Sequence, residues 1–309
     1  MVTGRNNAVP IKEIDVGFRY IVTDLMAGVF PGIVFGIASI IANERNPFIA
    51  FIRILCLVGY MLLYILGFTT INQVTGVAED RVWKIHRPIV SGLIDLNGGT
   101  KRFYIYNAIY LIFSILLAIF GMVPVLVSTL AWMGAYLACS VGGLSRIWWC
   151  KNLMNGIGTF AMLGATWSIG GGQWPFPSEA WSYINGLGFA ICWLAGLQDF
   201  RDVEADTAVG RKTYPMVFGD SRARFLMKIT FALLPIYTHF FVFPLSSAWW
   251  VPYPWEYIPL GLSWLIVHRL SLYQTPEEDR ETYNWLPRWY FSITVCAAIQ
   301  FFLIYVFNT

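Results

Sequence analysis

Nine apolar stretches of about 20 residues constrain the fold of this chain more than any other feature. A helix of about 20 apolar residues spans a bilayer core, where lipid offers no hydrogen-bond partners to an open backbone. Composition agrees, since 57% of the residues are hydrophobic and only 13% are charged. The sequence therefore predicts an all-α integral membrane protein with a bundle of nine transmembrane helices. The stretches are Leu25–Ala42, Ile54–Ile71, Phe103–Met122, Val123–Leu144, Leu153–Ile169, Trp181–Leu197, Ile229–Trp250, Tyr257–Tyr273 and Trp289–Phe307.

The basic residues separate between the two sides of the membrane that nine spans define. Of the 21 Lys and Arg residues, all but Arg45 and Arg53 fall in the N-terminal segment or in connections on its side. Positive residues mark the cytosolic side of membrane proteins. We therefore predict a multi-pass protein, in contact with membrane lipid, whose N-terminus and charged connections are cytosolic. In a eukaryote we expect it in the endoplasmic reticulum. The net charge of +3 does not suggest a nucleic-acid partner, and no obligatory protein partner is indicated.

The first of two long cytosolic connections begins at Ile71 and reads INQVTGVAEDRVWKIHRPIVSGLI. If the preceding helix continues, Asn72, Gly76 and Asp80 fall at i, i+4 and i+8 and share one face. Glu79 lies beside them. The basic residues that follow are Arg81, Lys84 and Arg87.

The second acidic connection begins at Leu197 and reads LQDFRDVEADTAVGRKTYP. Asp199, Asp202 and Asp206 fall at i, i+3 and i+7, which again places them on one helical face. The basic residues within and after this stripe are Arg201, Arg211 and Lys212.

Carboxylates on one helical stripe repel one another unless a cation lies between them. Carboxylate and amide oxygens suit hard divalent cations, and Mg²⁺ is commonly held by carboxylates together with substrate phosphate oxygens. Two acidic stripes, each followed by basic residues on the same side of the membrane, therefore predict a site for Mg²⁺ and a diphosphate. The alternative is a pair of ordinary charged loops whose acids form salt bridges or face water.

These segments resemble the two motifs of the UbiA superfamily of intramembrane prenyltransferases. The first motif reads Asn-x3-Asp-x3-Asp before Arg-Pro-x3-Gly, and the second reads Asp-x2-Asp-x3-Asp before a Gly-x-Lys-Thr tail. The matching residues are Asn72, Asp80, Arg87, Pro88 and Gly92 in the first, and Asp199, Asp202, Asp206, Gly210, Lys212 and Thr213 in the second. Gly76 departs from the pattern, because the first motif usually carries a metal-binding Asp there.

The resemblance implies a single UbiA-like domain over residues 1–309, with a lateral opening to lipid and two motifs facing each other across a cavity. It implies an enzyme that binds an isoprenyl diphosphate through Mg²⁺ and ionises it to an allylic cation. The implied metal ligands are Asn72, Asp80, Asp199, Asp202 and Asp206, with Glu79 as a further catalytic residue. The implied diphosphate-binding residues are Arg81, Lys84, Arg87, Arg146, Lys151, Arg201 and Lys212.

The fate of the cation separates two activities within the superfamily. A prenyltransferase transfers the isoprenyl group to an aromatic acceptor, whereas a terpene cyclase lets the cation react with double bonds of the same chain. Gly76 followed by Glu79-Asp80 resembles the fungal membrane-bound terpene cyclases, so we expect cyclisation of farnesyl or geranylgeranyl diphosphate. Prenyl transfer is the first alternative.

A transporter of lipids or ions is the second alternative. It predicts ionisable residues deep in several spans, yet only Asp24, near the start of the first span, stands out. One more charged segment follows the eighth span, and we expect it to be a solvated charge run without chemistry. Its acidic residues are Glu277, Glu278, Asp279 and Glu281.

Overall fold

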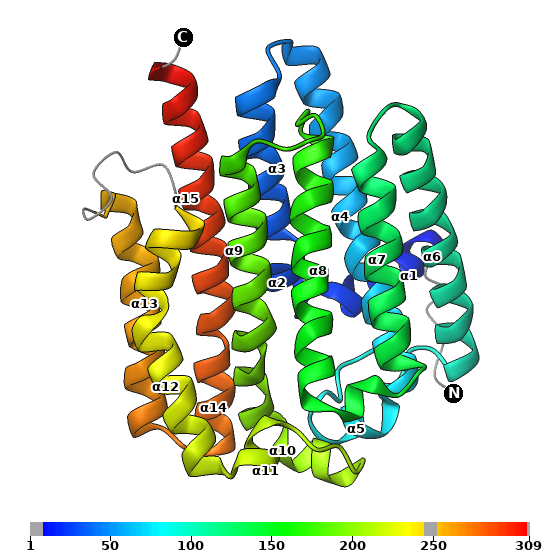
Figure 1. The fold of residues 1–309 in the computed structure, drawn as a ribbon. Coiled ribbons are helices and arrows are strands. Elements are labelled where there is room, and N and C mark those ends of the chain that lie inside the picture. Colours follow the sequence, from blue (N-terminus) through cyan, green and yellow to red (C-terminus); the bar gives the residue numbers. More distant parts are fainter. Residues whose placement is uncertain (1–8, 244–251, 308–309) are drawn as a thin grey trace.

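The computed structural model describes residues 9–243 and 252–307, and within these ranges the chain is a helical bundle without β-strands (Figure 1). Its long helices run side by side, while α5, α10 and α11 lie together at one end. The helices are α1 (Val9–Ile21), α2 (Leu25–Gly28), α3 (Phe30–Asn43), α4 (Pro47–Thr75), α5 (Val77–Trp83), α6 (Leu96–Ile119), α7 (Val123–Ser140), α8 (Trp148–Ile169), α9 (Ser178–Leu194), α10 (Gln198–Ala208), α11 (Tyr214–Phe218), α12 (Asp220–Tyr237), α13 (Tyr257–Leu272), α14 (Pro276–Tyr283) and α15 (Trp285–Phe307).

Seven helical segments within the described residues are long and apolar enough to cross a membrane, which supports an integral membrane protein. They coincide with seven of the nine expected spans. The other two expected spans lie in α8 and α13, and α13 has only 16 residues. The span expected at Ile229–Trp250 ends in residues that lie outside the described ranges. The count of nine spans therefore stays a prediction.

Helix α8 is enclosed by other helices, and most of its residues are buried. It contacts α3, α7 and α9. Its Trp167 is buried, with ring centroids 5.3 Å from Phe35 of α3 and 4.7 Å from Phe301 of α15. At Gly156 an added Cβ would lie 1.9 Å from Cys192 Sγ of α9. Small residues of this kind allow the close approach typical of membrane helix pairs.

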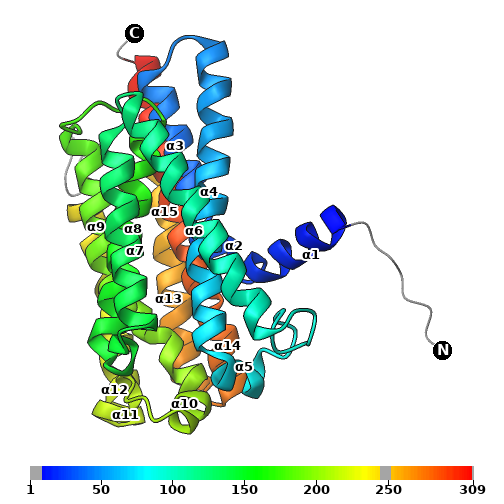
Figure 2. The same cartoon turned by 90° about the vertical axis from the view of Figure 1, so that its right-hand side faces the viewer.

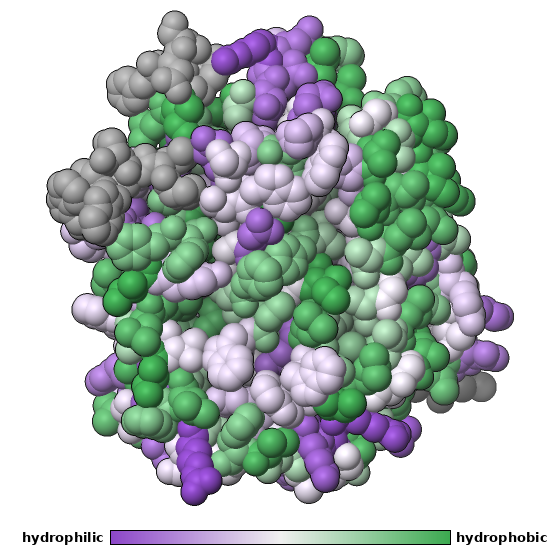
Figure 3. All heavy atoms as spheres, in the orientation of Figure 1, coloured by the Kyte–Doolittle hydropathy of each residue, from purple (hydrophilic) through white to green (hydrophobic). Residues whose placement is uncertain are grey.

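The surface of the bundle separates apolar from charged residues. Hydrophobic atoms cover much of its flanks, and hydrophilic atoms gather at the end that carries α10 and α11 and also at the opposite end (Figure 3). Helix α1 projects sideways from the bundle (Figure 2). The distribution fits a body that spans lipid and exposes its charged end to water.

The helical path bends where α4 meets α5. Helix α4 ends at Thr75, and Gly76 separates it from α5 with φ −98° and ψ 16°. Glycine has a low helix propensity, which favours such an interruption. The single continuous stripe predicted from Asn72 to Asp80 is therefore not formed, whereas Asp199, Asp202 and Asp206 all lie in α10.

The acidic segment after α13 is only in part the solvated run that the sequence predicts, because Glu277 and Glu281 are exposed but Asp279 is buried. It forms α14, which packs against α10. Asp279 is 3% exposed and accepts hydrogen bonds of 2.7 and 2.6 Å from both Nη atoms of Arg224 in α12. The prediction was wrong for Asp279 because spacing along the chain does not reveal which side of α14 contacts α10.

Candidate active site

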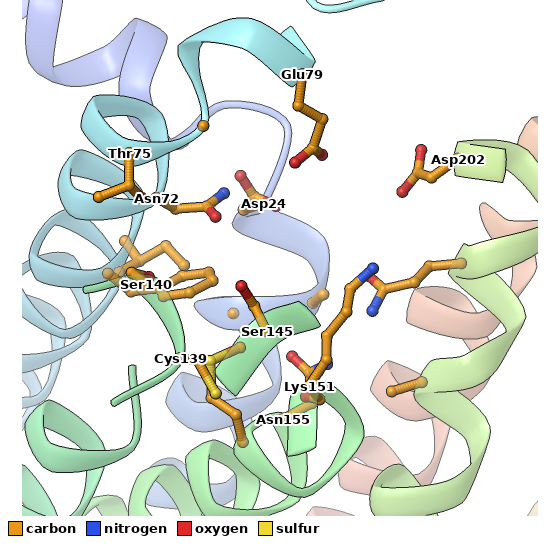
Figure 4. Close-up of a pocket in the computed structure, with 18 of the residues that line it drawn as sticks. Asp24, Asn72, Thr75, Glu79, Cys139, Ser140, Ser145, Lys151, Asn155 and Asp202 are labelled. Atoms are coloured by element: carbon orange, nitrogen blue, oxygen red, sulfur yellow. The ribbon is translucent and has the colours of Figure 1, made fainter. Parts of the chain in front are cut away.

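A cavity of about 430 Å³ opens between the helices and receives side chains from both acidic segments. Asn72 and Glu79 line it from the first segment, and Asp202 lines it from the second. Figure 4 shows Glu79, Asp202 and Asp24 pointing into the same space, with the amide of Asn72 beside Asp24. Two segments more than a hundred residues apart in sequence thus meet at one cavity.

Cations alternate with the acids of the second segment. Lys151 of α8 places its Nζ 2.8 Å from Asp199 Oδ1 and 4.0 Å from Asp206 Oδ2. The other oxygen of Asp199 accepts a hydrogen bond of 3.2 Å from the backbone N–H of Tyr214. Arg211 Nη1 donates to Asp206 Oδ1 at 2.9 Å. Asp199 and Asp206 of α10 are therefore paired with cations and do not line the cavity.

The same alternation continues through the first segment. Arg211 Nη1 also donates to Glu79 Oε2 at 2.6 Å, so it joins the two segments. Lys84 Nζ lies 3.1 Å from Glu79 and 3.6 Å from Asp80. Arg87 Nη1 lies 2.7 Å from both oxygens of Asp80. Because Arg87 holds Asp80, Glu79 rather than Asp80 faces the cavity.

The positive side chains around Glu79 set its ionisation. Burial alone would raise the pKa of Glu79, but Lys84, Arg211 and Lys151 outweigh it and lower the pKa to about 2. An opposite charge nearby favours the ionised form of a carboxyl group. Glu79 is therefore negatively charged over the whole physiological pH range.

The residues expected to form the site fall into three groups. Eight line the cavity: Asn72, Glu79, Lys84, Arg87, Arg146, Lys151, Arg201 and Asp202. Three are buried acids that bond to cations and do not line it: Asp80, Asp199 and Asp206. Two are exposed and lie away from the cavity lining: Arg81 and Lys212. Only the backbone of Lys212 makes a contact here, since its N–H donates to the Arg146 carbonyl at 3.3 Å.

Arg211 is a cavity residue that the sequence did not assign to the diphosphate. Its place in the Gly-Arg-Lys-Thr tail was the available signal, but the family pattern directs attention to the Lys. Asp24 also lines the cavity. It stood out in the sequence only as an ionisable residue near an apolar stretch.

Aromatic side chains form the apolar part of the cavity. Tyr64 of α4 stacks on Trp132 of α7 with ring centroids 5.1 Å apart, and Phe68 lies 5.1 Å from the same Trp132. Tyr283 and Tyr290 line another part. Faces of aromatic rings attract cations, by about 2 kcal/mol or more when the pair is desolvated.

The donor chemistry of the polar part fits a hard divalent cation. Asp206 Oδ2 is buried and accepts no hydrogen bond, and Asn72 and Asp202 present oxygens to the cavity. Such oxygens are the preferred ligands of Mg²⁺. Across the part of the chain that the structure covers, however, no three His, Cys, Asp or Glu side chains lie close enough together to hold a metal ion.

Comparison with known proteins gives consistent matches across most of the chain. A sequence model of the UbiA prenyltransferase family matches residues 29–305. Somaliensene A/B synthase of Streptomyces somaliensis is 32% identical over 289 residues, which cover 93% of this chain and 93% of that protein. Diterpene cyclase eriG of Hericium erinaceus is 32% identical over 225 residues, 72% of this chain and 70% of that one.

A relative with a different activity in its name matches at a similar identity. Polyprenyl transferase eriF of Hericium erinaceus is 33% identical over 228 residues, 72% of this chain and 74% of that protein. Among solved structures, a UbiA homolog from Archaeoglobus fulgidus bound to DMAPP and Mg²⁺ superposes with a TM-score of 0.63 at 14% identity. This superposition covers 93% of this chain and 99% of that one, and it shows a shared fold.

Proposed function

Because the chain belongs to the UbiA prenyltransferase family, we propose that it is a membrane-bound, Mg²⁺-dependent terpene cyclase acting on an isoprenyl diphosphate. One observation carries the proposal: a single cavity joins a charged part, with Glu79, Asp202 and Lys151, to an aromatic part, with Tyr64 and Trp132. A substrate with a diphosphate head and a hydrocarbon chain has the same two parts.

The charged part promotes departure of the diphosphate. The carbon–oxygen bond breaks with its electron pair going to the diphosphate, so negative charge develops there. Positive groups fixed at that position lower the barrier. Those that line the cavity are Lys84, Arg87, Arg146, Lys151, Arg201 and Arg211.

Magnesium supplies further charge neutralisation of the leaving group when it is bound. Asn72 and Asp202 would hold it from the cavity lining, with Asp80, Asp199 and Asp206 of the two motifs behind them. Structural neighbours bound to Mg²⁺ with DMAPP or GPP support a requirement for Mg²⁺.

The aromatic part protects and guides the allylic cation. Burial among Tyr64, Phe68 and Trp132 excludes water, which would otherwise capture the cation early. The π electrons of a distal double bond then form a carbon–carbon bond to the cation, and positive charge moves to a carbon farther along the chain. The last cation loses a proton to give a cyclic hydrocarbon, or adds water and then loses a proton to give an alcohol. Cyclisation therefore needs no isoprenyl acceptor in the cavity.

Two observations favour cyclisation over prenyl transfer. Gly76 replaces the Asp of the first motif, and two relatives named as a synthase and a diterpene cyclase match the chain at 32% identity. The match to polyprenyl transferase eriF favours transfer to an acceptor as the second candidate.

The proposal includes nine spans, a lateral opening to lipid and a cytosolic N-terminus, and in a eukaryotic cell a location in the endoplasmic reticulum. The two acidic segments then face the cytosol. Support comes from the concentration of basic residues in connections on one side.

Incubation of membranes with farnesyl or geranylgeranyl diphosphate and Mg²⁺, without any acceptor, tests the activity. A cyclic hydrocarbon or alcohol supports the cyclase. Product that forms only when a phenol or quinone precursor is added selects the transferase. Absence of product in both assays, from protein that elutes as a folded species in detergent, contradicts both and favours the transporter.

A further inference from the structure

One face of helix α1 carries large apolar side chains that point away from the bundle. Ile14 and Phe18 lie four residues apart, so they share a face of the helix, and they are 72% and 54% exposed. Val22 is also exposed, and its N–H donates to the Phe18 carbonyl, which continues the helical turn. We call these three residues the α1 stripe. Neighbouring exposed apolar residues of this kind indicate an interaction surface.

Another face of α1 holds the helix against the bundle. Val16 and Tyr20 are buried, and the backbone carbonyl of Tyr20 accepts a hydrogen bond of 3.2 Å from Gln73 Nε2 of α4. Glu13 accepts a hydrogen bond of 3.0 Å from Arg102 Nε of α6. These contacts fix α1 on α4 and α6, whereas the described residues leave the α1 stripe uncovered.

The partners of α1 mark the boundary between the lipid-spanning part and the charged end. Gln73 lies two residues before the end of α4, which is about 3 Å along the helix axis. Arg102 directly precedes Phe103, where the long apolar run of α6 begins. From this level α1 extends sideways, away from the bundle (Figure 2). It therefore occupies space that lipid fills around a membrane-spanning bundle.

The charged residues of α1 lie on the face next to the α1 stripe. Asp15 and Arg19 each follow a residue of the stripe, and one residue turns an α-helix by about 100°. Their side chains pair at 3.1 Å and are each 47% exposed. Separate apolar and charged faces are typical of a helix in the membrane interface, where the apolar face enters the boundary between headgroups and acyl chains.

We propose that α1 lies in the membrane interface on the side of the two acidic segments and buries the α1 stripe among lipid acyl chains. The Asp15–Arg19 pair then faces water and the lipid headgroups. The level of α1 and its sideways course favour lipid as the partner over another protein. The helix thus anchors the chain along the membrane surface, in addition to the helices that cross it. This placement does not depend on which reaction the cavity catalyses.

Cysteine substitution tests where the α1 stripe lies. The variants are Ile14→Cys and Phe18→Cys, and Asp15→Cys on the charged face is the matched control. Each full-length protein is placed in lipid nanodiscs that hold one copy and is treated with a water-soluble maleimide. Mass spectrometry of the tryptic peptide 13–19 measures the rate, and this peptide contains all three positions and no native cysteine.

Maleimide reacts with the thiolate, which forms poorly in apolar surroundings. We therefore expect Ile14→Cys and Phe18→Cys to react at least about tenfold more slowly than Asp15→Cys. Packing within the protein predicts no such order, because Ile14 is more exposed than Asp15. Either stripe position alone decides the test if the other variant does not elute as a folded protein in detergent.

Three results would contradict the inference. Similar rates in all three variants would show that the α1 stripe faces water. Protection of the stripe in native membranes but not in nanodiscs would identify a protein partner or a second copy in place of lipid. Slow reaction of Asp15→Cys would show that the charged face is also out of water. Because labelling does not require catalysis, failure of the cyclase assignment would leave this inference standing.

Discussion

Arg211 and Glu79 are 132 residues apart in the sequence and form an ion pair of 2.6 Å between the two acidic segments. The same Nη1 atom of Arg211 lies 2.9 Å from Asp206. Both acids are largely shielded from water, with side-chain exposures of 12% for Glu79 and 0% for Asp206. One guanidinium group therefore compensates two buried negative charges and ties α5 to α10.

Replacing Arg211 by Met should destabilise the folded protein by at most about 3 kcal/mol, because each of two buried carboxylates loses one of its two cations. Glu79 keeps Lys84 and Asp206 keeps Lys151. Thermal or denaturant unfolding in detergent measures this loss. The double variant Glu79→Gln with Arg211→Met removes one of the two buried carboxylates that lose Arg211 and should recover part of the stability. Arg81→Met, which changes an exposed residue of α5, is the control. Equal stability of the two Arg variants would contradict the bridging role of Arg211.

The depressed pKa of Glu79 predicts how stability depends on pH. Its pKa falls from 4.5 to about 2 on folding, so the folded state favours the ionised carboxylate. The resulting stabilisation, about 3 kcal/mol, is complete above pH 4.5 and disappears as the pH falls toward 2. We expect the difference in unfolding free energy between wild type and Glu79→Gln to stay constant from pH 8 to 5. A difference that changes between pH 6 and 8 would show that Glu79 titrates there.

Sequence spacing predicted the second acidic segment better than the first. Asp199, Asp202 and Asp206 fit within one uninterrupted helix, so their spacing predicts a common stripe. In the first segment the helix is interrupted at Gly76 and Arg87 holds Asp80, which leaves Glu79 facing the cavity. A local pattern does not show which of several nearby cations will pair with an acid.

The apolar wall of the cavity was still less predictable. Aromatic residues are abundant throughout the chain, and in lipid-spanning helices hydropathy does not separate a side chain facing lipid from one facing a cavity. Tyr64, Trp132 and Tyr290 line the cavity because of how α4, α7 and α15 pack. That packing depends on contacts between segments far apart in sequence.

Asp202 faces the cavity, and its variants test the proposed metal and diphosphate site. We expect Asp202→Asn to lower the rate of diphosphate release by at least about a hundredfold, as for loss of one charge-stabilising group in other enzymes. Chelation of Mg²⁺ should abolish release from the wild type. Glu277→Gln changes an exposed acid of α14 and should leave the rate unchanged. Wild-type turnover by Asp202→Asn with the metal chelated would remove Asp202 from the proposed site.

Asp279 is expected to position α10 through Arg224, although it does not line the cavity. Arg224 pairs with Asp279 at 2.6 Å, and its guanidinium lies 4.7 Å from the centre of the Phe200 ring in α10. Asp279→Ala leaves Arg224 without its buried partner and should cost about 3 kcal/mol of stability. Glu281→Ala is the matched control, because Glu281 pairs with Arg269 from a side chain that is 72% exposed, and exposed pairs contribute at most about 1 kcal/mol. Denaturant unfolding of the two variants measures both losses. Similar losses in Asp279→Ala and Glu281→Ala would show that the Arg224 pair does not hold α14 against α10.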